Sequence, residues 1–160
     1  MRKSEREVIG EQEKFEALLR CPFLTLGMRG EVPYLVPLNF GAELCEGQLV
    51  LYFHCAKEGK KLDFLRLDPN ISFSAANMLR VFNKGVAPCG FTTDYESVYG
   101  IGKAEILKDK AARLHGLKVL MAHYTDEIFV DDSFLPRPLA LAEVVKISVR
   151  EWTCKRLVRD

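Results

Sequence analysis

The chain has 160 residues and a mass of 18.2 kDa, the size of a single domain that can bury its own core. Its net charge of +1 gives no field that would attract nucleic acid or a membrane surface. No apolar run is long enough to span a membrane, the charged N-terminus lacks the pattern of a signal peptide, and five dispersed cysteines form no zinc or redox motif. We therefore expect a cytoplasmic protein with reduced thiols and neither a nucleic-acid nor a membrane partner.

Apolar periodicity and turn residues predict a helix, a hairpin, a further strand, a short helix, two strands, a helix and a last strand. The expected ranges are a helix to about residue 20, strands over 23–28, 32–40 and 48–54, a helix over 60–67, strands over 71–76 and 95–107, a helix after 109 and a strand over 140–149. Ser4 and Glu7 have the spacing of a capping box for the first helix. Pro33 and Pro37 each remove a ladder donor, which predicts an edge or bulged strand.

Three further features lie in the second half of the chain. Residues 78–93 have little periodicity and several chain breakers, so they predict an irregular loop. Gly100 and Gly102 fall within the long strand that follows, where a bulge or a bend is expected. Asp109 is suited to cap the helix after that strand.

The expected fold follows from the order of these elements. Hairpins joined by short connections favour a mainly β, α+β domain whose antiparallel sheet closes into a barrel with helices outside. The chain has no early glycine fingerprint and no regular alternation of strands and helices, which argues against a Rossmann fold. We expect one domain over residues 1–160, with its core at about 5–155.

Residues 51–62 are the stretch most suggestive of a ligand. They read as the end of an apolar strand, a turn with one glycine, and the start of a helix. The first turn of a helix has unpaired N–H groups and about half a positive charge from the helix dipole. Lys57, Lys60 and Lys61 add charge of the same sign, and Gly59 allows a ligand to approach the backbone. The pattern indicates a phosphate site; a solvated lysine-rich turn is the alternative.

Five segments taken together carry a resemblance to a known family: Val32-Pro33-Tyr34-Leu35-Val36-Pro37-Leu38-Asn39-Phe40, Leu51-Tyr52-Phe53-His54-Cys55-Ala56, Gly59-Lys60-Lys61, Tyr95-Glu96-Ser97-Val98 and Gly102-Lys103-Ala104. They resemble the pyridoxamine 5′-phosphate oxidase-like proteins, most of all the nitroimidazole-resistance branch. The resemblance implies an antiparallel FMN-binding split barrel with peripheral helices, and a homodimer that holds FMN in two clefts between subunits. The chain departs from many relatives at Cys55, and at Thr153-Cys154-Lys155, where they have Thr-Gly-Lys.

The resemblance also implies which residues would meet the cofactor. Lys61 matches the family lysine that contacts the FMN phosphate. The candidate cofactor-binding residues are Pro37, Leu38 and Asn39 along the flavin ring, His54, Cys55, Ala56, Lys60 and Lys61 around the phosphate, Tyr95, Glu96, Ser97 and Val98 on a neighbouring strand, and Trp152. His54 is also the candidate catalytic residue, because histidine readily exchanges a proton near neutral pH. On the residues alone, His54 is better explained as a structural histidine and Trp152 as a packing anchor.

The sequence shows no nucleophile–base pair, no glycine elbow and no cluster of metal ligands. His115 and His123 are two helical turns apart, too far to share a metal, and Asp131-Asp132 suits a solvated loop. The resemblance therefore implies an FMN-dependent oxidoreductase that reduces a small electrophile such as a nitro-aromatic, fed by reduced nicotinamide or another donor. An F420-dependent reductase on the same fold, and a flavin- or haem-binding protein without turnover, are the alternatives.

Overall fold

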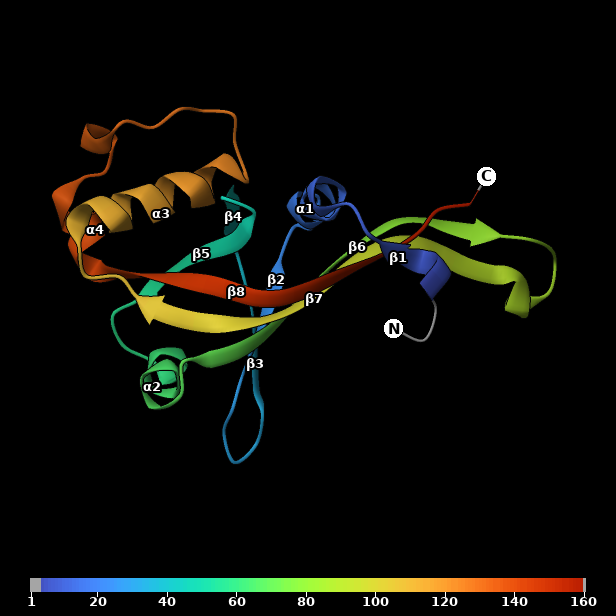
Figure 1. Cartoon of the computed structure of the whole chain (residues 1–160), viewed down its shortest axis with the longest axis horizontal. Coiled ribbons are helices and arrows are strands. Elements are labelled where there is room, and N and C mark those ends of the chain that lie inside the picture. The colour runs from blue at the N-terminus through green and yellow to red at the C-terminus, as the bar shows by residue number, and fades with distance from the viewer. Residues whose placement is uncertain (1–3, 160) are drawn as a thin grey trace.

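The structure is a computed structural model that describes residues 4–159, and its centre is one eight-stranded antiparallel sheet (Figure 1). The strands are β1 (Glu7–Val8), β2 (Leu24–Met28), β3 (Tyr34–Leu38), β4 (Gly41–Cys45), β5 (Gln48–Ala56), β6 (Asn70–Asn83), β7 (Phe91–Ile106) and β8 (Ala142–Leu157). The helices are α1 (Glu11–Leu19), α2 (Lys60–Leu67), α3 (Lys110–Ala122) and α4 (Pro136–Leu141). Within residues 4–159, no helix has both the length and the hydropathy required to cross a membrane.

The sheet is open between its two end strands. Its order is β3-β2-β6-β7-β8-β5-β4, with β1 paired to β8, and no hydrogen-bonded ladder joins β3 to β4 in the described residues. Pro37 cannot donate a ladder bond, and the Phe40 N–H donates instead to the Tyr124 hydroxyl at 3.1 Å. The expectation of a closed barrel was therefore wrong. The antiparallel split barrel with peripheral helices is confirmed, and β3 lies at an edge as the prolines predict.

Alternate residues of the strands fill the core, and α3 covers part of the opposite face. Phe53, Phe73 and Ile147 each expose at most 1% of their surface inside the sheet. The helix α3 packs on β4, β5 and β8 (Figure 1), where a second apolar cluster forms around Tyr52. A Cβ at Gly41 would lie 2.5 Å from the backbone of α3, so only glycine permits this close approach.

A two-stranded arm projects from the body of the sheet (Figure 1). β6 continues to Asn83 and β7 begins at Phe91, so most of residues 78–93 is a paired hairpin. The irregular loop expected over this range was therefore wrong. Most of its residues are exposed, so it lacks a one-sided burial pattern, and this hides its strands in the sequence. We call residues 78–93 the β-arm.

Several other boundaries differ from those expected. The capping box at Ser4 and Glu7 was wrong, because residues 7–8 pair with β8, and α1 begins at Glu11 without a side-chain cap. The strand β4, the short helix α4 and the extension of β8 to Leu157 were not expected. The sequence was right about α2 and about Asp109, whose carboxylate accepts a bond from the Ala112 N–H at 2.9 Å.

Candidate functional site

The turn between β5 and α2 leaves backbone donors free at a helix N-terminus. Gly59 has a φ of 132°, which favours glycine, and a Cβ built there would meet no atom within 4 Å. The Gly59 carbonyl accepts bonds from the N–H groups of Leu62 and Asp63. The N–H groups of Lys60 and Lys61 therefore precede the first donor that the helix can use. The open space above Gly59 gives an anion access to them.

The two lysines of this turn lie over aromatic rings. The Lys60 ammonium is 5.2 Å from the ring centroid of Tyr34 and 5.7 Å from that of Phe64, and these two rings stack on each other. The Lys61 ammonium is 5.3 Å from the ring centroid of Phe53. Neither lysine forms an ion pair within residues 4–159. The turn therefore presents two oriented positive charges that the protein itself does not neutralise.

The end of β5 alternates between the core and the surface. His54 and Ala56 are exposed, whereas Cys55 is half-buried and packs against the core. Burial raises the pKa of the Cys55 thiol, and the nearby Lys61 charge only partly opposes this. The thiol is consequently protonated at neutral pH and a poor nucleophile. The side chain of His54 makes no hydrogen bond within the described residues, and is free to face a ligand.

The strand β3 meets α2 through Tyr34, its first residue, and its last residues offer edge backbone. Pro37 and Asn39 are exposed, and Leu38 is buried. The last β4–β5 pair joins Gly41 to Tyr52, so Asn39 and His54 each lie two residues beyond it. Because β3 pairs only with β2 in the described sheet, its other edge leaves polar backbone groups available to a ligand.

The candidates on β7 point alternately to the two faces of the sheet. Ser97 lies on the outer face, in a depression of 380 Å³ that Tyr99 and Lys155 also line. Glu96 lies on the inner face and is 2% exposed. Its carboxylate accepts bonds from Arg20 at 2.7 and 2.8 Å and from Arg156 at 2.7 Å. These arginines, Arg20 above all, hold the pKa of Glu96 below its usual range.

The remaining candidates on β7 and β8 have these positions: Tyr95 is half-buried and accepts a bond from Arg6 at 3.4 Å, Val98 is buried in the core, and Trp152 lies under the Lys14 ammonium at 4.3 Å. Asn70, just after α2, pairs with Lys103, and Ser97 lies six residues farther along β7. At about 3.3 Å per residue, that is roughly 20 Å. One protomer therefore brings Lys61 of α2 to Phe53 near the end of β5 but holds Ser97 of β7 apart from α2.

Sequence reasoning missed the aromatic rings beneath the lysines. Tyr34 and Phe64 are 30 positions apart, and their stacking depends on how the β2–β3 hairpin meets α2. The spacing of four residues between Lys60 and Phe64 on one helix was the available signal. Within residues 4–159, no group of three or more potential ligands could hold a metal ion.

Comparison with known proteins gives one family and several similar structures. The profile of the family described as Pyridoxamine 5′-phosphate oxidase matches residues 11–156. A structure from Bacteroides thetaiotaomicron, assigned to 5-nitroimidazole antibiotic resistance, is 25% identical with a TM-score of 0.78, over 93% of this chain and 85% of that one. The flavocytochrome Anf3 from Azotobacter vinelandii is 18% identical with a TM-score of 0.79, over 99% and 72%. An FAD and heme binding protein from Mycobacterium smegmatis is 20% identical with a TM-score of 0.73, over 94% and 73%. No curated protein matches the chain.

Proposed function

The chain belongs to the pyridoxamine 5′-phosphate oxidase family, and from this premise we propose that it is a flavoprotein that binds FMN. The observation that carries the proposal is the turn formed by Gly59, Lys60 and Lys61, which we call the phosphate turn. It has open space above Gly59, free N–H groups and two lysines without an ion pair. A terminal phosphate bears up to two negative charges and several acceptor oxygens, and this arrangement complements both. Two of the similar structures are a flavocytochrome and an FAD and heme binding protein, which supports a flavin cofactor without distinguishing FMN from other flavins.

Different residues of the chain would contact the phosphate and the ring of FMN. Lys60, Lys61 and the N–H groups of the first α2 turn would hold the phosphate. The edge backbone of β3 and the Asn39 side chain would orient the polar edge of the ring, and His54 would hold or release a proton beside it. When bound, FMN supplies the transfer of hydride or single electrons, and the protein supplies position and charge.

We propose that the flavoprotein reduces a small electrophile such as a nitro-aromatic, using reduced nicotinamide or another donor. The similarity to the structure assigned to 5-nitroimidazole resistance supports this choice of substrate class. The competing cofactors are F420 and haem, and the chromophore that purifies with the protein distinguishes among the three.

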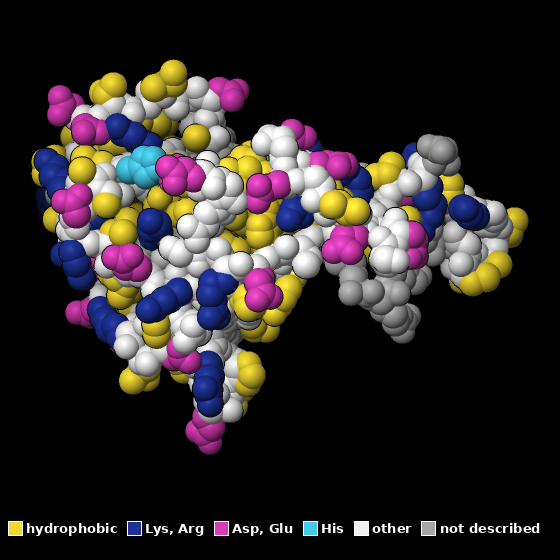
Figure 2. Space-filling model, viewed as in Figure 1, with side chains coloured by type: hydrophobic (Ala, Val, Ile, Leu, Met, Phe, Trp, Pro, Cys, Tyr) yellow, Lys and Arg dark blue, Asp and Glu magenta, His cyan; other side chains and the backbone are white. Residues whose placement is uncertain are grey.

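We also propose that the protein works as a homodimer. In one protomer Ser97 lies roughly 20 Å along β7 from Lys103, the partner of Asn70 just after α2, so a second copy would complete a cleft that uses both β7 and the turn at Gly59. The β-arm exposes Met78, Val81 and Phe91, and Figure 2 shows hydrophobic side chains at its far end. A two-stranded hairpin without a packed face is marginally stable in water. A partner subunit would cover these side chains.

The experiment that tests the cofactor is a pair of fluorescence titrations, with FMN and with riboflavin. Lys61→Ala removes a charge-assisted contact to the phosphate, so it should weaken FMN by roughly tenfold or more and leave riboflavin unchanged. Lys108→Ala makes the same charge change outside the turn, at a side chain that is 78% exposed, and should change neither affinity. An equal loss of FMN and riboflavin in Lys61→Ala would remove Lys61 from the phosphate site, and a haem Soret band would contradict the flavin.

A further inference from the structure

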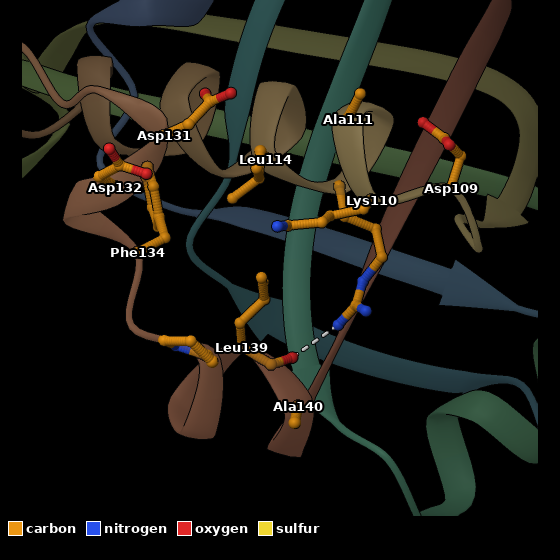
Figure 3. A pocket seen from close by; sticks show the side chains of 11 residues that line it. Asp109, Lys110, Ala111, Leu114, Asp131, Asp132, Phe134, Leu139 and Ala140 are labelled. Atoms are coloured by element: carbon orange, nitrogen blue, oxygen red, sulfur yellow. Dashed lines mark hydrogen bonds between the residues drawn. The ribbon is translucent and has the colours of Figure 1, made fainter.

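A cavity of 770 Å³ lies apart from the phosphate turn, between α3 and the segment 131–140 (Figure 3). None of its walls is formed by a candidate cofactor residue. Its lining consists of Asp109, Lys110, Ala111, Arg113, Leu114, Asp131, Asp132, Phe134, Pro136, Leu139 and Ala140. The volume is that of a small-molecule site, and the lining combines apolar side chains with a few charged ones, as such sites do.

The walls of this cavity are tied together before any ligand arrives. The Arg113 guanidinium on α3 donates bonds to the carbonyls of Leu139 at 2.6 Å and Ala142 at 2.7 Å, at the end of α4. Lys118, also on α3, forms an ion pair with Asp131 at the other end of the segment. Both ends of the segment are therefore fastened to the same helix. A preformed cavity loses less entropy when it binds a ligand.

Two charged side chains of the lining make neither a hydrogen bond nor an ion pair with the described residues. Asp109 caps α3, Asp131 pairs with Lys118, and Arg113 holds the carbonyls. Lys110 and Asp132 form no ion pair with each other or with any other described residue. In Figure 3 the Lys110 ammonium is directed from α3 into the cavity, and Asp132 lies on the facing side.

The space between these opposite charges is apolar. Leu114 forms part of the floor and is 4% exposed, and Phe134 and Leu139 are half-buried beside it. Lys110 and Asp132 are both exposed, so each would attract an opposite charge of a ligand through a partly screened interaction. A molecule with one charge of each sign and an apolar body satisfies both walls and the floor.

We propose that this cavity binds a small zwitterion with an apolar body, of the class of apolar dipeptides. The carboxylate of the ligand meets Lys110, its ammonium meets Asp132, and its side chains lie on Leu114, Phe134 and Leu139. The site involves binding only and does not depend on the proposed flavin site.

The test is isothermal titration of the purified full chain with leucyl-phenylalanine and two blocked analogues, N-acetyl-leucyl-phenylalanine and leucyl-phenylalanine amide. The free dipeptide should bind with a Kd on the order of 0.1–1 mM. Each blocked analogue should bind about three- to tenfold more weakly, because it lacks one partly exposed charge pair. Absence of measurable heat at millimolar dipeptide, or equal binding of all three compounds, would overturn the proposal.

Three variants assign the contacts, and a fourth is the control. Lys110→Met should remove the preference for a free carboxylate, and Asp132→Asn should remove the preference for a free ammonium. Ala111→Trp, at an exposed position on the cavity wall, should block all three compounds. Lys108→Met, an equally charged change outside the lining, should bind as the unmodified protein does. Unchanged ligand preferences in the Lys110 and Asp132 variants would show that the zwitterion does not bind here.

Discussion

His54 is the candidate residue for proton transfer beside the turn at Gly59. It is exposed at the end of β5 and its side chain makes no hydrogen bond within residues 4–159. His54→Gln keeps some hydrogen-bonding capacity but removes proton exchange. We expect FMN affinity to be retained and the oxidation of reduced protein by a nitro-aromatic to slow by about 10²–10⁴-fold, the usual range for lost general acid–base catalysis.

Single-turnover stopped flow separates the two effects in this variant. Flavin fluorescence titration gives the affinity, and the decay of the reduced-flavin spectrum gives the rate. An unchanged rate with intact FMN binding would make His54 a structural residue of the turn. A loss of affinity without a change in rate would assign it to cofactor binding alone.

At the scale of residues, sequence reasoning succeeded where the signal is local and failed where it joins distant segments. The lysines near Gly59 follow one another in the chain, and the structure keeps them together at one helix end. The ion pairs of Glu96 reach 76 positions to Arg20 and 60 to Arg156. A polar residue in a strand ordinarily indicates a solvent-facing position, so only the fold reveals this buried carboxylate.

Glu96 on β7 connects this strand to α1 and β8, so its substitution tests how strongly these elements stabilise one another. Its carboxylate is bound by Arg20, just after α1, and by Arg156 on β8. Both arginines are partly exposed, so solvent screens the pairs. We expect Glu96→Gln to lower the free energy of unfolding by about 1–3 kcal/mol at neutral pH. Glu151→Gln, at an exposed position on β8, is the matched control and should change it little.

The pH dependence of this difference has a definite sign. Arg20, then Arg156, holds the pKa of Glu96 below its usual range in the folded state. The stabilisation is therefore fully present above the ordinary pKa of a glutamate and is lost as the pH falls through the lowered folded value. Urea unfolding should give a gap between the two proteins that is wide at neutral pH and narrows in acid. A gap that stays constant into acid would mean that packing, not charge, accounts for the loss.

At the scale of elements, amphipathic periodicity decided what could be predicted. The helix α2 was predicted over its full range because it has one buried side and clear ends. The β-arm has most of its residues exposed on both faces, so it shows no alternation to recognise. The first turn was mistaken for a helix start because capping residues also suit a 3₁₀ turn, and the chain then pairs with β8, where only Val8 is buried.

At the scale of the molecule, the fold class followed from the order of elements, but closure did not. Pro37 already predicted an edge at β3, but the bond of the Phe40 N–H to the Tyr124 hydroxyl joins residues 84 positions apart, which periodicity does not report. The arrangement of the whole molecule also decides which candidate residues can share one site. The sequence resemblance placed residues of β7 and of α2 at the same cofactor, whereas the structure holds them apart in one protomer.

The assembly state can be tested only on the whole molecule, and we predict a homodimer. We expect sedimentation equilibrium at micromolar concentration to give twice the mass of the chain, since a cleft completed by a second copy implies an interface above about 2,000 Å². Val81→Glu places a charge on the exposed apolar face of the β-arm, where Val81 is 61% exposed, and should shift the protein toward monomer. Ile128→Glu is the matched control: this residue is 94% exposed outside the β-arm and should leave the dimer intact.

If the cofactor cleft is formed by two subunits, loss of the dimer should also weaken FMN binding, so measuring both tests the cleft. A Val81→Glu monomer keeps the turn at Gly59 but lacks the second copy that would cover the flavin ring. It should therefore bind FMN more weakly while its circular dichroism remains that of the folded chain. A flavin-loaded monomer of the unmodified protein would contradict the dimer and the shared cleft together. If Val81→Glu remains a dimer with unchanged FMN affinity, the β-arm is not part of the interface. An apolar interface could not accommodate a buried carboxylate without a partner.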